Sequence, residues 1–188
     1  MDMLEFNQVL IEGERQTLSL IAEKGSVTVL TGVSDEILSL YFQAILGFVN
    51  ILNGHICIDG EPLTAYSAAS FRRQMAYAPS KLRKLGEVVN YEPPSVQDIF
   101  SLKVNRSLPI SNGILAEEMK KVGGDSNNDQ IQLIAVAALL EKPIMLIENP
   151  PVESMPYLRQ LAAKDKIVLL TSNDGEVLSL SHKTVNIY

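Results

Sequence analysis

The stretch SVTVLTGVSDEILS at residues 26–39 decides the fold class of this 188-residue chain. Residues Ser26–Leu30 form a short run rich in β-branched side chains, which predicts a buried strand that Thr31-Gly32 ends. From Asp35 to Asn50 apolar residues recur at helical spacing. Ser34 is a good N-cap for that helix, and the acids in its first turn suit the helix dipole. A strand, a glycine turn and a helix in this order are the setting of a phosphate-binding loop.

The same alternation of strands and helices continues along the chain. Further strands are expected at Thr17–Ala22, Gly54–Asp59, Met75–Ala78, Pro143–Ile147, Ile167–Thr171 and Thr184–Tyr188. Further helices are expected at Ser67–Arg73, Val96–Leu102, Gly113–Lys121, Ser126–Leu140, Met155–Ala163 and Gly175–Leu180. Asp59-Gly60 predicts a hairpin turn, and Ser126 with Asp129 predicts a capping box. Apolar strands alternating with helices predict a mostly parallel sheet covered on both faces, in one domain.

The composition argues against several classes of partner. Hydrophobic residues make up 46% of the chain and charged residues 20%, as in ordinary globular proteins. The formal net charge is -6, so no electrostatic footprint for nucleic acid or acidic lipid is present. We therefore expect no nucleic-acid partner, and contact with a membrane only through another protein.

Metal binding and export are not expected either. Cys57 is the one cysteine, and His55 and His182 have no partner at ligand spacing, so we expect no metal site. The N-terminus lacks the basic start and apolar core of a secretory signal. The longest apolar stretch, Leu38–Leu52, is too short to span a bilayer. These features predict a cytoplasmic protein, or one that is peripheral on the inner face of the membrane.

Five further stretches follow one another along the chain: GHICIDGEPL at 54–63, SFRRQMAYAP at 70–79, SVQDI at 95–99, the helix at 126–140 and the strand at 143–150. In order and spacing they resemble motifs of ABC-transporter ATP-binding domains, the last two being similar to the signature motif with its helix and to the Walker B strand. Any α/β domain has apolar strands, but ordered matches at family spacing favour the resemblance. It implies an α/β, P-loop NTPase-like ABC ATPase fold over residues 1–188. That fold has a mostly parallel sheet covered by helices, an N-terminal antiparallel β part, and here a shortened helical subdomain at about 96–125.

The phosphate-binding motif itself is altered. The pattern G-x-x-x-x-G-K-[ST] uses glycines and a lysine to hold phosphates and a hydroxyl to hold Mg²⁺. Aligned on Gly32, the second glycine becomes Ile37 and the lysine becomes Leu38, while the hydroxyl remains as Ser39. Two acids, Asp35 and Glu36, stand where the polyphosphate would lie. Each would oppose a phosphate charge by on the order of 3–4 kcal/mol before screening, whereas micromolar binding amounts to only about 8 kcal/mol.

The other motif positions are altered as well. By the resemblance, the Mg²⁺-ordering aspartate is Glu148, the catalytic glutamate Asn149, the Q-loop glutamine Ser80, the switch histidine Asn173 and the D-loop aspartate Met155. The signature motif reads DSNND at 125–129, which keeps Ser126 but neither glycine. No adenine-stacking aromatic is obvious near the N-terminus, Phe6 being the nearest. An amide at 149 cannot accept a proton from the attacking water.

These substitutions leave three functional hypotheses. The first is a non-catalytic ABC-type subunit that docks on a transmembrane permease or pairs with an active ATPase, with no cofactor. The second is an ATP-binding transporter subunit with weak or partner-assisted hydrolysis, in which case ATP and Mg²⁺ bind. The third is a free-standing scaffold or regulatory domain. ATP hydrolysis is the activity that the resemblance implies, and the residues that would perform it are replaced.

The vestigial nucleotide site also carries a structural expectation. Residues Gly32, Ser34, Asp35, Leu38, Ser39, Ser80, Ser126, Glu148, Asn149 and Asn173 are its candidate positions. The first-turn amides of the helix from residue 35 need an acceptor when no phosphate arrives. We expect Ser34, Asp35 or Glu36 to supply it from within the same helix.

Overall fold

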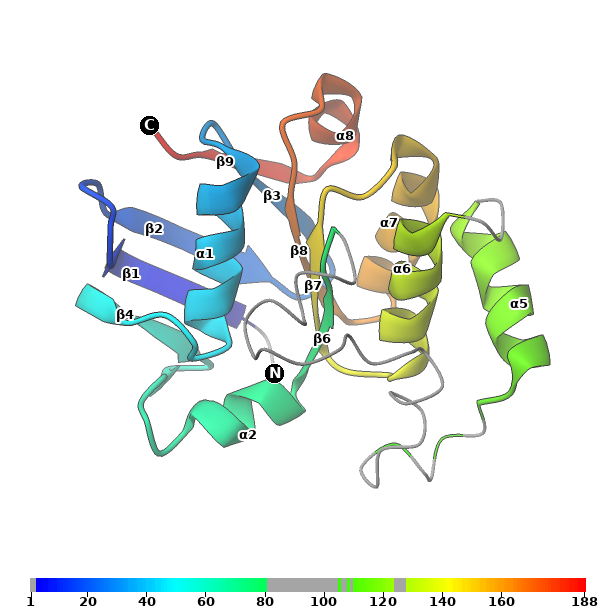
Figure 1. The fold of residues 1–188 in the computed structure, drawn as a ribbon, viewed down its shortest axis with the longest axis horizontal. Coiled ribbons are helices and arrows are strands. Elements are labelled where there is room, and N and C mark those ends of the chain that lie inside the picture. Colours follow the sequence, from blue (N-terminus) through cyan, green and yellow to red (C-terminus); the bar gives the residue numbers. More distant parts are fainter. Residues whose placement is uncertain (1–2, 81–104, 106–107, 109, 124–127) are drawn as a thin grey trace.

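Two sheets organise the chain, as Figure 1 shows for the computed structural model, which describes residues 3–80, 105, 108, 110–123 and 128–188. The larger sheet has five parallel strands in the order β6-β7-β8-β3-β9. They are β3 (Val27–Thr31), β6 (Met75–Ala78), β7 (Ile144–Glu148), β8 (Ile167–Thr171) and β9 (Lys183–Asn186). The smaller sheet is antiparallel in the order β2-β1-β4-β5. Its strands are β1 (Met3–Ile11), β2 (Leu18–Glu23), β4 (Ile51–Ile58) and β5 (Glu61–Pro62).

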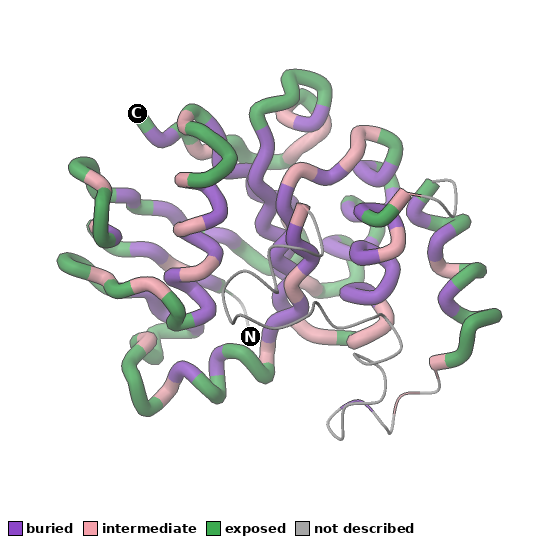
Figure 2. Tube along the Cα trace, in the orientation of Figure 1, coloured by how far each residue is buried: buried purple, intermediate pink, exposed green. Residues whose placement is uncertain are grey.

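Helices cover both faces of the parallel sheet. They are α1 (Asp35–Ile45), α2 (Ala68–Arg73), α5 (Asn112–Val122), α6 (Asp129–Leu139), α7 (Met155–Ala163) and α8 (Gly175–Leu180), with a 3-10 turn at Val152–Ser154. Val29 packs in the cluster with α5, α6 and α7, whereas its neighbour Leu30 packs in the cluster with α1 and the antiparallel sheet. Buried residues accordingly run through β3, β7 and β8 and along the helix faces next to them (Figure 2). The predicted sheet, buried on both faces, is confirmed.

Most predicted elements are confirmed with small shifts at their ends, and two helix boundaries were wrong. α1 ends at Ile45 rather than Asn50, because Gly47 at φ +76 closes it: the Gly47 N–H donates to Ala44 O and that of Phe48 to Gln43 O. This is the two-bond glycine stop of many helices. The predicted capping box was also wrong, since Asn128 is the N-cap of α6 and accepts from the N–H of Gln130 and Ile131.

The expected helix at Val96–Leu102, part of the predicted helical subdomain, and Ser126 lie outside the described residues. α5 is the described part of this region, and Ser111 caps it by accepting from the Ile114 N–H at 3.3 Å.

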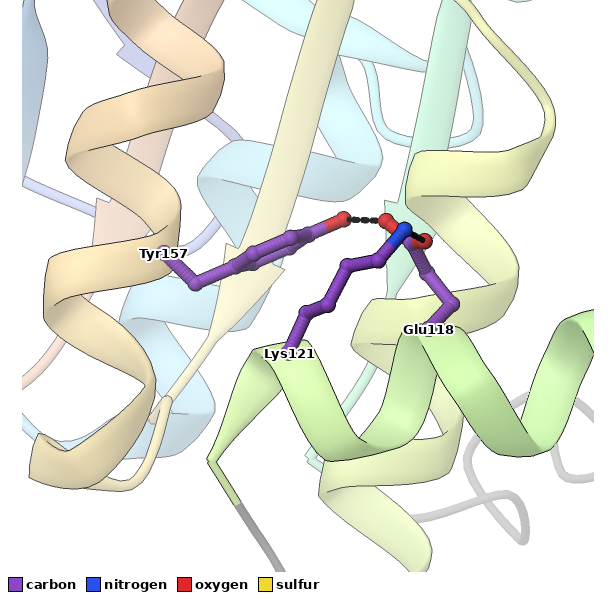
Figure 3. A network of polar contacts seen from close by, with 3 residues as sticks. All are labelled: Glu118, Lys121 and Tyr157. Atoms are coloured by element: carbon purple, nitrogen blue, oxygen red, sulfur yellow. Dashed lines mark hydrogen bonds and ion pairs between the residues drawn. The ribbon is translucent and has the colours of Figure 1, made fainter.

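A polar contact fastens α5 to α7 (Figure 3). The Glu118 carboxylate on α5 accepts hydrogen bonds from the Tyr157 hydroxyl on α7 and from Lys121 Nζ, the latter at 2.7 Å. Burial alone would raise the pKa of Glu118, but the hydrogen bonds from Lys121 and Tyr157 outweigh it and the pKa lies below its ordinary value. The ionised carboxylate is therefore the form that holds the two helices together.

Replacing Tyr157 by phenylalanine should lower the free energy of unfolding by about 1–2 kcal/mol, because Glu118 loses a donor in a partly buried place. A carboxylate whose pKa is lowered in the folded protein adds stability at neutral pH that is lost as the pH falls through that pKa. The difference between Tyr157→Phe and the parent should therefore shrink on acidification. Urea unfolding at several pH values measures this difference in the free energy of unfolding. Tyr188→Phe, which removes the hydroxyl of an exposed tyrosine, is the matched control. Equal midpoints for all three proteins at neutral pH would contradict the expectation.

Candidate functional site

The parallel sheet gathers the predicted site residues at one edge. β3 pairs with β8, and β8 pairs with β7, so their carboxyl ends lie side by side. Asp35 begins the helix after β3, Asn149 follows β7, and Asn173 comes two residues after β8. In open α/β sheets ligands bind outside these carboxyl ends. The candidate positions from distant parts of the chain thus meet where the fold class places a site.

The Asp35 carboxylate lies between two side-chain amides. Its Oδ2 accepts from Asn149 Nδ2 at 2.8 Å, and its Oδ1 accepts from Asn173 Nδ2 at 3.3 Å. The partners are 114 and 138 residues away in the chain. Hydrogen bonds to an ionised acceptor are stronger than neutral ones. The carboxylate therefore joins the ends of three strands.

Asn173 also ties the loop after β3 to the end of β8. Its Oδ1 accepts from Thr31 Oγ1 at 2.9 Å and from the Gly32 N–H at 3.1 Å. Its Nδ2 donates to Val33 O at 2.9 Å as well as to Asp35. These bonds fix the orientation of the amide whether or not the bond to Asp35 is present.

The backbone at Asn149 suits an asparagine. Its φ is +43, in the left-handed region that asparagine tolerates better than most residues. Its N–H donates to Thr171 O at 2.7 Å, which holds the turn against β8. The side chain is therefore presented toward Asp35 by a backbone that is itself anchored.

A second cluster surrounds the Glu148 carboxylate, which is 1% exposed. Oε1 accepts from Ser39 Oγ at 2.5 Å and from the Tyr77 hydroxyl at 2.7 Å, and Oε2 accepts from the Ser80 N–H at 3.0 Å. Burial and the nearby Glu148 charge raise the pKa of Tyr77 far above its ordinary value, so the phenol stays a donor. The cluster satisfies a buried acid with donors from α1, from β6 and from Ser80, two residues after β6.

Gly32 is held by close packing rather than by an open loop. Its φ is +100, and a Cβ built there would lie 1.8 Å from Asn186 Oδ1 and 2.4 Å from Ile187 O. The Ile187 N–H donates to Thr31 O at 2.8 Å and keeps the two segments together. Only glycine fits where the end of β9 passes the end of β3.

The residues expected to face phosphate have other surroundings. Leu38 is fully buried and belongs to the cluster between α1 and the two sheets, and Ile37 packs at its margin. Ser34 is the N-cap of α1, but its side chain makes no capping hydrogen bond, so Ser34 does not supply the expected acceptor. Asp35 also departs from the expectation, because its acceptor oxygens bind amides from the ends of β7 and β8 rather than from its own helix.

Some contributors were not predicted from the sequence. Tyr77 and Asn186 were absent from the predicted set, and no local pattern marks either as a neighbour of the site.

Two other residues named from the sequence lie in the core. Met155, at the D-loop aspartate position, is fully buried. Phe6 is also buried, at 2% exposure, and so is not available to stack on a base.

Sequence comparison identifies a transporter relative. No protein-family model matches the chain. An ATP-dependent lipid A-core flippase from Xanthomonas campestris pv. campestris is 27% identical over 147 residues, which cover 70% of this chain and 25% of the flippase. The chain therefore matches about a quarter of the length of this curated relative.

Solved structures agree in fold across nearly the whole chain. A bacterial ABC transporter cassette solved as a dimer has a TM-score of 0.74 at 16% identity, with 98% of this chain and 94% of the cassette covered. The cbiO1 protein of Clostridium perfringens, part of the ABC transporter complex cbiONQ, has a TM-score of 0.69 at 13% identity, with 99% and 85% covered. This chain has the ABC ATPase fold and resembles the ATP-binding cassettes of ABC transporters.

Proposed function

We propose that this protein is an ABC-transporter-type ATP-binding subunit homologue that does not hydrolyse ATP and acts by docking on a transmembrane permease or an active ATPase partner. The observation that carries the proposal is the Asp35 carboxylate, bound by Asn149 and Asn173 where the resemblance puts the phosphates of ATP. A negative group that is already bonded at this position opposes a polyphosphate there.

The donor set does not suit a nucleotide. Asp35 and the neighbouring Glu36 bring two negative charges to the start of α1. Leu38, at the lysine position, is an apolar side chain with no exposed surface. Each repulsion amounts to on the order of 3–4 kcal/mol before screening, and the attraction of a lysine is missing. These terms together oppose micromolar binding, which amounts to only about 8 kcal/mol in total.

The Mg²⁺ side of the site does not suit the ion either. Ser39 and Glu148, the positions that would order Mg²⁺, are hydrogen-bonded directly to each other. The carboxylate is also engaged by Tyr77 and by the Ser80 N–H. A metal ion would have to displace donors from a buried acid. At Asn149 an amide replaces the group that would accept the proton of the attacking water.

The fold supports partners of the kind found in transporters. One similar cassette was solved as a dimer, and another is described as part of a transporter complex. Within the described ranges no helix is long and apolar enough to cross a membrane. The location that we propose, in the cytoplasm and peripheral to the inner face of the membrane, rests on the likeness to transporter cassettes and on the proposed partner.

Two alternatives are distinguished by simple observations. A functional ATP-binding subunit with weak or partner-assisted turnover would bind Mg-ATP and release phosphate. A free-standing scaffold would be monomeric in solution, with no permease gene beside its own. A neighbouring permease gene together with an absence of nucleotide binding favours the non-catalytic subunit.

Steady-state phosphate release tests the catalytic part of the proposal. We expect the purified protein to release phosphate from Mg-ATP no faster than its Ser39→Ala and Asn149→Ala variants, because none of the three has a carboxylate at position 149 to accept the proton of the attacking water. The two variants remove, in turn, the vestigial Mg²⁺ hydroxyl and the amide beside Asp35. Hydrolysis by the parent that disappears in Ser39→Ala would contradict the proposal and favour the weak ATPase.

A further inference from the structure

We infer that the Asp35 carboxylate is a tethered anion that closes its own site, and that removing it exposes a binding site for a free oxyanion such as inorganic phosphate. The inference deepens the proposed function, on which it rests, by naming the contact that keeps the site shut. Asp35, Asn149 and Asn173 then act together, rather than being three independent replacements of motif residues.

The two residues that donate to the carboxylate are also held by other hydrogen bonds, Asn149 through its backbone and Asn173 through its side chain. Asn149 is anchored by its backbone N–H, which donates to Thr171 O at 2.7 Å. Asn173 is anchored through its Oδ1, which accepts from Thr31 Oγ1 and from the Gly32 N–H. The Asn173 amide should therefore keep its position when Asp35 is shortened, and the anchored backbone at 149 should keep the Asn149 amide within reach of the same, now empty, acceptor position.

The surroundings favour a replacement anion from solvent. Asp35 and Asn173 are both exposed, so an anion can reach the position without unfolding any element. The eleven-residue helix α1 begins at Asp35, and its Ser34 N-cap side chain makes no capping bond. The positive end of the helix dipole adds to the two amide donors, as it does where helices bind phosphate, and offsets part of the Glu36 charge that remains in the first turn.

The three side chains also depend on one another in charge. The glutamate that the resemblance places at 149 would face Asp35 as a like charge, whereas Asn149 donates to it at 2.8 Å. Placing a carboxylate at 35 thus requires an uncharged donor at 149. An ABC-type glutamate at this position would suit a site without Asp35.

Thermal melting of Asp35→Ala in inorganic phosphate tests the inference. At phosphate about twentyfold above its dissociation constant, the melting temperature should rise by about 4–7 °C relative to sodium chloride at the same ionic strength. The parent, and a matched Asp35→Ala/Asn149→Ala/Asn173→Ala variant, should show only the smaller rise that phosphate gives through general salt effects. An equal rise in all three proteins would overturn the inference.

A second measurement keeps the inference testable if Asp35→Ala does not fold. Asp35→Asn keeps the volume and removes the charge, and Asn149→Ala removes one donor. If the two act through their mutual bond, the double variant should melt no lower than the less stable single variant. Additive losses would overturn the inference. Micromolar Mg-ATP binding by the parent would instead contradict the proposed function, so the two failures are distinguishable.

Discussion

Gly32→Ala should lower the free energy of unfolding by about 2–5 kcal/mol, a large loss for a single added methyl group. The added Cβ would lie 1.8 Å from Asn186 Oδ1 and 2.4 Å from Ile187 O, so the end of β9 must move away. Overpacking of this kind costs about 1–3 kcal/mol, and the positive φ adds about 1–2 kcal/mol for a residue with a Cβ. Urea unfolding of the purified variant measures the sum.

Gly25→Ala is the matched control for this substitution. Gly25 has φ +84, but a Cβ there would meet nothing within 4 Å. It should therefore show only the backbone part of the loss, about 1–2 kcal/mol. Equal losses at the two glycines would contradict the packing explanation. Unequal losses would mean that the close approach of β9 by itself requires a glycine at position 32, the first glycine position of the phosphate-binding motif.

Leu38→Lys, the substitution that restores the family lysine, should destabilise the protein by about 4 kcal/mol or more and restore no ATP hydrolysis. Leu38 is fully buried among the side chains between α1 and the sheets. Burial can lower a lysine pKa by about 3–5 units, at about 1.36 kcal/mol for each unit at neutral pH. Asp35, Glu36, Ile37 and Asn149 all remain, so the site still lacks the chemistry for hydrolysis.

The pH dependence identifies the cause of that loss. A lysine whose pKa is lowered in the folded protein binds fewer protons folded than unfolded, so stability should rise as the pH rises toward 10. The apolar substitution Leu38→Met should cost less than about 1.5 kcal/mol at every pH. A small, pH-independent loss in Leu38→Lys would contradict the buried environment. Hydrolysis above that of a Ser39→Ala control would show that the lysine alone repairs the site.

The architecture could be predicted from the sequence because its signals are local. β3, β8 and β7 appear as apolar runs of strand length, and the Asp59-Gly60 turn between β4 and β5 has the positive φ values, 50 and 82, that its residues favour. Boundaries were less predictable. At α1, Gly47 ends the helix while apolar residues continue beyond it, so periodicity alone extends the helix too far.

The site was predictable in its positions but not in its pairings. Motif spacing placed Asp35, Asn149 and Asn173 at the same edge of the sheet. It could not show that the two amides bind the carboxylate, because those bonds join residues 114 and 138 positions apart. From the acidic residues at the start of α1 we expected hydrogen bonds within that helix. The structure instead satisfies Asp35 from neighbouring strands, which local sequence does not encode.

Tyr77 illustrates the same limit. Its position in β6 was predicted, but its hydroxyl reaches Glu148 on the neighbouring strand β7 at 2.7 Å. Tyr77 lies directly opposite Leu146 in the register of these parallel strands, two residues before Glu148. Strand order and register must be known before such a contact can be inferred, and neither follows from the spacing of motifs.

Calorimetric titration of the purified protein with Mg-ATP tests the central claim most directly, namely that the cassette fold persists with a site closed to nucleotide. We expect no saturable heat below millimolar concentration, because Asp35 is already bound by Asn149 and Asn173 and Leu38 replaces the phosphate-binding lysine. The melting temperature should likewise not rise with Mg-ATP, since a ligand stabilises only a native state that binds it. A micromolar dissociation constant, with a matching rise in melting temperature, would contradict the account.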